Sequence, residues 1–92
     1  MTKIRKEVVV KNKLGLHARP AALFVQTANK FDSNIAVEKD NQRVNGKSIM
    51  GILTLGAEQG SRIIIEAEGS DAESAILELE GLVEENESNS KT

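Results

Sequence analysis

The sequence predicts an α+β protein: an open-faced β-sandwich in which three helices cover one face of a four-stranded antiparallel sheet. Segments of strand-like and helix-like hydrophobic periodicity follow one another in the order β-α-β-β-α-β-α. The connections after the hairpin-like turns are too short for parallel neighbours. A chain of 92 residues with 39% hydrophobic content can build one small core. We therefore expect one domain over residues 1–86, followed by a polar, disordered tail over residues 87–92.

Four segments have the composition and alternation of strands. Val8 and Val10 fall on one face of the first segment, and Ile35 and Val37 on the inner face of the second. The turn Asp40-Asn41 predicts that a short third strand returns as a hairpin. A run of three isoleucines in the fourth segment favours a central position for this strand in the sheet. The expected strands are 4–11, 34–39, 42–44 and 62–67.

Three segments are predicted to be helical. The first, over residues 18–29, places Ala21, Phe24, Val25 and Ala28 on one buried stripe. Ser48 is a favourable N-cap for a short helix over 49–55 that Gly56 ends. For the last helix, Ser70 and Glu73 have the spacing of a capping box. Its expected apolar face consists of Ala72, Ala75, Ile76, Leu79, Leu82 and Val83.

Composition excludes several classes of function. The chain has no cysteine, which rules out disulfides, zinc–thiolate sites and thiol catalysis, and we expect neither a metal nor a cofactor. A net charge of −2 and only two aromatic residues argue against nucleic-acid binding. No apolar run approaches the ~20 residues that span a bilayer, so we expect a cytoplasmic protein that does not insert into membranes. No pair of carboxylates is placed in a cleft, which argues against a hydrolase.

The stretch over residues 14–22 contains the only histidine and the only proline of the chain. His17 stands where the first helix should begin, beside backbone N–H groups that have no intrahelical acceptor. Arg19 adds a fixed positive charge, and Pro20 is tolerated in a first helical turn. A lone histidine is more often a capping or core residue. The sequence His-x-Arg-Pro at a helix start instead favours a site that holds phosphate against an imidazole.

A second candidate site surrounds Ser48, which by itself can be a simple helix cap. The helix after it carries more apolar residues than so short a helix can bury. We expect Ile49, Met50 and Leu53 to be exposed beside Ala22 and to form a surface for docking a partner. Met50 packed inward as a filler is the alternative.

Two motifs in these stretches match one family. Gly-Leu-His-Ala-Arg-Pro-Ala, residues 15–21, resembles the active-site signature of HPr, the histidine-containing phosphocarrier of the bacterial phosphoenolpyruvate-dependent sugar phosphotransferase system. Asn-Gly-Lys-Ser-Ile-Met-Gly, residues 45–51, resembles the family's second signature, around a regulatory serine. The resemblance covers about residues 4–85. It implies the strand order 1-4-2-3.

The resemblance also implies a function and partners. His17 would accept a phosphoryl group on Nδ1 from Enzyme I and pass it to the IIA domain of a sugar permease, as a carrier rather than an enzyme. From the chemistry of the residues themselves, we expect the backbone N–H groups of Ala18 and Arg19 to bind the phosphoryl oxygens, and we hypothesise that Arg19 screens their charge during transfer. Ser48 would be the site of an HPr kinase/phosphorylase. Some bacilli have a paralogue with glutamine at the histidine position, and the histidine here favours a working carrier.

Three functions remain open at this point. The first is a phosphoryl carrier for sugar uptake, which we expect to be monomeric. The second is a regulatory protein: a carrier of a nitrogen-type phosphotransferase chain, or a corepressor that acts on a transcription regulator through Ser48. The third is an interaction module with the same fold and no phosphorylation.

Overall fold

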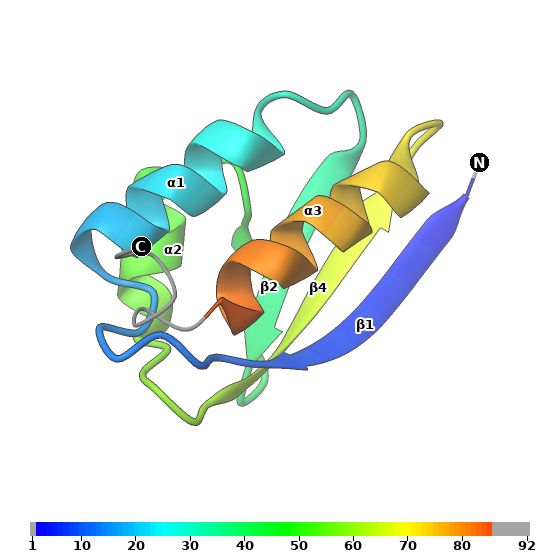
Figure 1. The fold of residues 1–92 in the computed structure, drawn as a ribbon. Coiled ribbons are helices and arrows are strands. Elements are labelled where there is room, and N and C mark those ends of the chain that lie inside the picture. The colour runs from blue at the N-terminus through cyan, green and yellow to red at the C-terminus, as the bar shows by residue number, and fades with distance from the viewer. Residues whose placement is uncertain (1, 86–92) are drawn as a thin grey trace.

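The computed structural model describes residues 2–85, and its elements follow the predicted order (Figure 1). The two elements over 34–39 and 49–55 have the predicted bounds, and the bounds of the other strands and of the first helix differ by at most two residues. The elements are β1 (Lys3–Val9), α1 (Ala18–Ala28), β2 (Asn34–Lys39), β3 (Gln42–Asn45), α2 (Ile49–Leu55), β4 (Arg62–Glu68) and α3 (Ala72–Glu84).

The sheet has the order β1-β4-β2-β3, and every neighbouring pair is antiparallel. This confirms both the predicted sheet and the central position of β4. The hairpin between β2 and β3 turns through Asp40 and Asn41, whose φ angles are +50° and +70°. Aspartate and asparagine tolerate this left-handed conformation better than other non-glycine residues, which explains why this pair predicted the turn.

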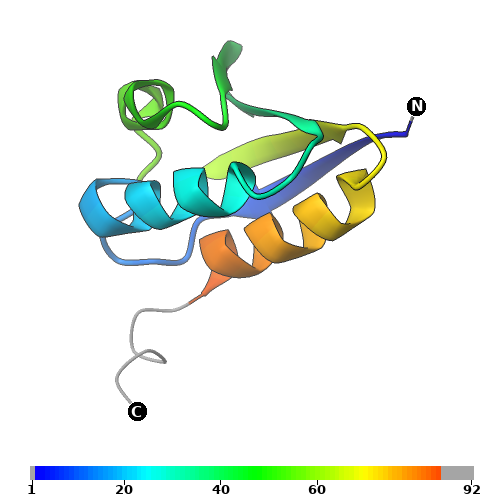
Figure 2. The same ribbon diagram turned by 90° about the horizontal axis from the view of Figure 1, so that it is seen from above.

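The helices α1 and α3 lie across one face of the sheet (Figure 2), and α2 lies next to α1 and contacts β2 and β3. The open-faced sandwich is therefore confirmed. The core fills the space between the helices and the sheet. Its fully buried large side chains include Val8, Phe24, Val37, Ile52, Ile63, Ile65 and Leu79. Among residues 2–85, no helix is both long enough and apolar enough to cross a membrane.

The start of α3 differs from the prediction. The N-cap is Asp71 rather than Ser70, and the capping box with Glu73 is wrong. The Asp71 carboxylate accepts hydrogen bonds from the backbone N–H groups of Asp32 and Ser33, at 2.9 and 3.0 Å, and from the Ser33 hydroxyl. These bonds lower the pKa of Asp71, with the Ser33 hydroxyl contributing most. The carboxylate therefore joins α3 to the segment before β2 instead of capping its own helix.

The face of the sheet opposite α1 and α3 carries a network of four charged side chains. Arg5 on β1 contacts Glu66 on β4 at 2.7 Å and Glu38 on β2 at 3.0 Å. Arg43 on β3 contacts Glu66 at 2.7 Å and also pairs with Glu38. Arg43 and then Arg5 lower the pKa of Glu66 to about 2. All four strands contribute one member, so the network joins strands that are distant in sequence.

Candidate functional site

His17 lies at the junction between the β1–α1 loop and α1. It is the N-cap residue of α1 in an extended conformation, with φ −125° and ψ 161°, and its carbonyl accepts the first helical hydrogen bond, from Ala21, at 3.5 Å. Its side chain forms no capping hydrogen bond, and the residue is half-exposed. The imidazole is therefore accessible at the end of α1 where backbone N–H groups lack intrahelical acceptors.

The loop before His17 is held against the α2–β4 connection. The N–H of Leu16 donates to the carbonyl of Ala57 at 2.8 Å, and the Leu16 side chain is buried. Gly15 has φ +65°, and a Cβ there would lie 2.5 Å from the Ala57 oxygen. Only glycine fits so close a backbone contact at this conformation. The backbone that leads into His17 is thus fixed by contacts to a distant part of the chain.

Ala18 follows His17 in a strained conformation. Its φ is +49°, one of three positive values at non-glycine residues among those that the structure describes. This conformation costs an alanine ~1–2 kcal/mol because its Cβ approaches the following carbonyl oxygen. The strain is located directly between the imidazole and Arg19. Such strain persists only where surrounding contacts hold the backbone, and here the contacts of Leu16 and the helix α1 lie on either side.

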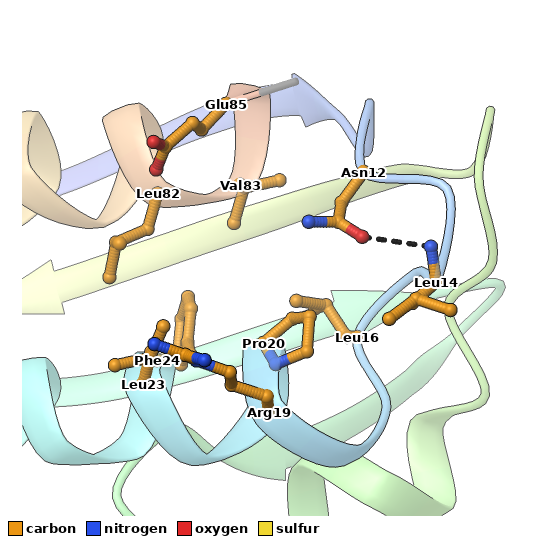
Figure 3. Close-up of a pocket in the computed structure, with 10 residues that line it drawn as sticks. All are labelled: Asn12, Leu14, Leu16, Arg19, Pro20, Leu23, Phe24, Leu82, Val83 and Glu85. Carbon is orange, nitrogen blue, oxygen red and sulfur yellow. Dashed lines mark hydrogen bonds between the residues drawn. The ribbon is translucent and has the colours of Figure 1, made fainter. Parts of the chain in front are cut away.

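Arg19 is exposed and lines a hollow of about 400 Å³ between the β1–α1 loop, α1 and the end of α3 (Figure 3). His17 does not line this hollow. Of the two residues that the sequence predicts for the site, only Arg19 therefore contributes to this hollow. The hollow is lined by Asn12, Leu14, Leu16, Arg19, Pro20, Leu23, Phe24, Leu82, Val83 and Glu85.

Two exposed residues of this hollow have no role assigned to them from the sequence, although Leu14 begins the stretch over residues 14–22. Leu14 is 53% exposed and Leu23 is also exposed, although both are large and apolar. Leu14 lies in the loop, where its N–H donates to the Asn12 side chain at 2.8 Å. Leu23 is on α1 but outside the predicted buried stripe. For Leu23, its position outside the buried stripe was the available signal, whereas no pattern gave Leu14 a role beyond beginning the stretch over residues 14–22.

Ser48 is the N-cap of α2, as predicted. Its hydroxyl oxygen accepts a hydrogen bond from the N–H of Gly51 at 3.1 Å, and the residue is half-exposed. The helix ends at Gly56, whose φ of +67° is the left-handed conformation of a C-terminal glycine. The hydroxyl is therefore both a structural cap and a group that lies within reach of solvent.

The exposed side chains of α2 agree with the expectation from the sequence. Met50 is 66% exposed, so the alternative of an inward-packed filler is wrong. Ile49 and Leu53 are also exposed, and Ala22 on α1 is half-exposed. The two helices contact each other (Figure 1). We call Ala22, Ile49, Met50 and Leu53 the α1–α2 surface; that it docks a partner stays a prediction.

No group of three histidine, cysteine or acidic side chains within residues 2–85 has the arrangement of a metal site. The only nucleophiles that the sequence singled out in this region are the His17 ring and the Ser48 hydroxyl. Arg19 is the one guanidinium in the loop and helix that surround them. This arrangement can hold a negatively charged group at His17 with backbone N–H groups and one nearby positive charge.

The chain is similar to known proteins over nearly its whole length. The family model described as "PTS HPr component phosphorylation site" matches residues 4–85. The HPr-like protein Crh of Halalkalibacterium halodurans is 51% identical over 81 residues, which cover 88% of this chain and 96% of that protein.

Solved structures give the same result. A crystal structure of the phosphocarrier protein HPr from Bacillus anthracis is 53% identical, with a TM-score of 0.88, covering 90% of this chain and 99% of that one. A structure described as an HPr dimer from Thermoanaerobacter tengcongensis is 62% identical, with a TM-score of 0.71, covering 84% of this chain and 88% of that one.

Proposed function

Because this chain belongs to the HPr family, we propose that it carries phosphoryl groups within the phosphoenolpyruvate-dependent phosphotransferase system, with His17 as the residue that bears them. Enzyme I would be the donor, and the IIA domain of a sugar permease would be the acceptor. The protein would act in the cytoplasm as a carrier that needs no cofactor. The position of His17 at an accessible helix start, with its ring not used as a cap, is the observation that carries this proposal.

The proposed chemistry is a reversible exchange of one bond to phosphorus. The lone pair of His17 Nδ1 forms a P–N bond while the bond between phosphorus and the donor breaks, and the reverse exchange with the acceptor frees the ring. A neutral imidazole is nucleophilic near pH 7, and its phosphoramidate is reactive enough to leave again. Phosphoryl transfer depends mostly on positioning and electrostatic stabilisation. The backbone N–H groups of Ala18 and Arg19 would supply this at the start of α1.

Incubation with phosphoenolpyruvate and Enzyme I tests this proposal. We expect intact-mass spectrometry to detect one added phosphoryl group that is labile in acid and stable in base. The His17→Ala variant should remain unmodified, with an unchanged circular dichroism spectrum. A wild-type chain that stays unmodified under these conditions would favour the interaction module without phosphorylation.

A second role, regulation through Ser48, is favoured by two observations. Ser48 is half-exposed, and the exposed residues Ile49 and Met50 follow it directly in the chain. We propose that an HPr kinase/phosphorylase modifies Ser48. The modification would add about −1.5 to −2 charges beside the α1–α2 surface and would repel an acidic partner. The chain is similar to Crh as well as to HPr, which is consistent with a regulatory role. This role would include action as a corepressor for a transcription regulator.

The Ser48→Asp variant is predicted to slow phosphorylation of His17 by Enzyme I while leaving the fold unchanged. The added carboxylate changes the charge of the docking surface but retains a group that can cap α2. Initial rates at several concentrations of the Ser48→Asp variant, with Enzyme I held constant, should show a raised KM of Enzyme I for the variant. Ser48→Asn is the neutral control with the same capping ability, and equal rates in both variants would contradict the electrostatic explanation.

The oligomeric state is proposed separately. We propose that the carrier form is a monomer, because the loop before His17 is complete within one chain. Leu16 and Ala57, whose hydrogen bond holds this loop, both belong to that same chain. One similar solved structure is described as an HPr dimer. Sedimentation equilibrium of the active protein distinguishes the two states, since a monomer of 92 residues has a mass of 10.0 kDa.

A further inference from the structure

Backbone hydrogen bonds hold the segment over residues 46–48 against the neighbouring strands. The N–H of Gly46 donates to the carbonyl of Ile35 on β2 at 2.8 Å, and the N–H of Ser48 donates to the carbonyl of Asn45 at 3.1 Å. A Cβ at Gly46 would lie 2.5 Å from a methyl carbon of Ile35. The segment is therefore packed closely on β2. These contacts alone do not reach α1.

Lys47 joins this segment to the turn that follows α1. Its ammonium group donates to the carbonyl of Phe31 at 2.7 Å, and its backbone N–H donates to the Asn45 side chain at 2.9 Å. Lys47 is half-buried, unlike Lys30, which is exposed and pairs with Glu78 at 2.9 Å. A half-buried ammonium that donates to a main-chain carbonyl is a strong, charge-assisted contact. The charged group of Lys47 thus stabilises the fold, at the position directly before Ser48.

Asn29 provides a second connection from the other side. The residue is the C-cap of α1, and its side-chain amide nitrogen donates to the carbonyl of Val25 at 2.9 Å and to the carbonyl of Lys47 at 3.3 Å. One amide group therefore bonds both to the last turn of α1 and to the residue before Ser48. Asn29 and Lys47 are 18 residues apart in sequence and meet only in the folded chain.

We propose that Asn29 and Lys47 are positioning residues for phosphorylation of Ser48: they hold the backbone before Ser48 against the end of α1, so that its hydroxyl has a fixed place relative to the α1–α2 surface on which the kinase docks. The inference rests on the proposed role of Ser48. Neither side chain touches the hydroxyl; they act through the backbone of residue 47. The same helix carries His17 at its N-terminus, so α1 contacts the surroundings of both proposed phosphorylation sites.

Kinetics with the serine kinase of the proposed function and ATP test this inference. Lys47→Met and Asn29→Ala should each lower kcat for Ser48 about fivefold, the effect of losing one net hydrogen bond from the reactive geometry. KM should stay unchanged because Ile49, Met50 and Leu53 remain. Lys47→Arg, which keeps the charge and donors, should recover most of kcat. Phosphorylation of His17 by Enzyme I should be unaffected in all three variants.

Two controls separate positioning from other effects. Lys30→Met removes an exposed lysine from the same end of α1 and should leave both reactions unchanged. Hydrogen exchange of the Ser48 amide should become faster in Lys47→Met and Asn29→Ala. Unchanged Ser48 kinetics in both variants, or equal losses at Ser48 and His17, would overturn the positioning role. If the kinase does not modify wild-type Ser48, the regulatory part of the proposed function is wrong as well, which is a separate result.

Discussion

Phosphoryl transfer depends mostly on positioning, and a ring that takes part in it must be accessible. His17 combines accessibility with a constrained backbone. The residue is half-exposed, whereas the residue before it, Leu16, is buried and hydrogen-bonded to Ala57. The strained Ala18 follows directly, with φ +49°. At the scale of the residue, accessibility and constraint are divided between neighbours: His17 is half-exposed, while the backbone before it is held by contacts.

Arg19→Ala is predicted to slow phosphoryl transfer from Enzyme I to His17 by roughly tenfold, because a guanidinium near the phosphate stabilises charge in the transition state. Arg19 lines the hollow next to α1, whereas His17 does not. Rapid-quench kinetics measure the rate. Arg19→Lys keeps the charge but loses the fork of donors, so its transfer rate should lie between those of wild type and Arg19→Ala. Wild-type rates in Arg19→Ala would contradict the role.

At the scale of the element, α1 connects the parts of the candidate site. Its N-terminus carries His17, its exposed side contributes to the α1–α2 surface, and its end is bonded to Lys47 through Asn29. The helix α3 is fixed differently. Its N-cap, Asp71, reaches across to Ser33, a buried residue just before β2. Gly69 lies so close to Ser33 that a Cβ would be 2.5 Å from its hydroxyl oxygen.

Asp71→Ala is predicted to lower the melting temperature by several degrees, because it removes the acceptor for the N–H groups of Asp32 and Ser33 and for the buried Ser33 hydroxyl. Ser70→Ala should leave the melting temperature nearly unchanged, since Ser70 is exposed and is not the cap. Thermal unfolding followed by circular dichroism compares the two. A larger loss of melting temperature in Ser70→Ala than in Asp71→Ala would instead support the capping box that the sequence suggested.

At the scale of the whole molecule, the two faces of the sheet are stabilised differently. One face is covered by α1 and α3 and is apolar, and the other carries the Arg5, Glu38, Arg43 and Glu66 network across all four strands. Glu66 is only 5% exposed, so its charge is partly withdrawn from water and depends on the two arginines. The network therefore links folding stability to pH.

Glu66 is predicted to make stability fall with acid. Its pKa is about 2 in the folded protein, below the ordinary value of 4.5. Since the unfolded chain then binds the proton more readily, the stabilisation is complete above about pH 4.5 and is lost as the pH falls toward 2. Glu66→Gln should cost roughly 1 to 2 kcal/mol at pH 7 and much less at pH 2.5.

Urea unfolding of wild type and Glu66→Gln at pH 7, 4 and 2.5 measures this difference. Glu84→Gln, a change on the exposed side of α3, is the control. A loss in Glu66→Gln that stays the same at all three pH values would show that the network contributes through packing rather than through charge.

The sequence determined the elements because their signals are local. Alternation in β2, the Asp40-Asn41 turn, and the Ser48 and Gly56 caps of α2 each depend on neighbouring residues, and the structure has them as predicted. The candidate site could also be located in the sequence, because His17, Arg19 and Ser48 lie in two short motifs.

The tertiary structure alone decided which distant groups meet. Asp71 has the residue type of a cap, and only the approach of Ser33 directs its carboxylate away from α3. Lys47 has the residue type of a solvated charge, and only the end of α1 places the Phe31 carbonyl within its reach. The physical reason is the same in both cases. A hydrogen bond requires a partner within about 3 Å, and for long-range pairs that distance exists only after the chain has folded.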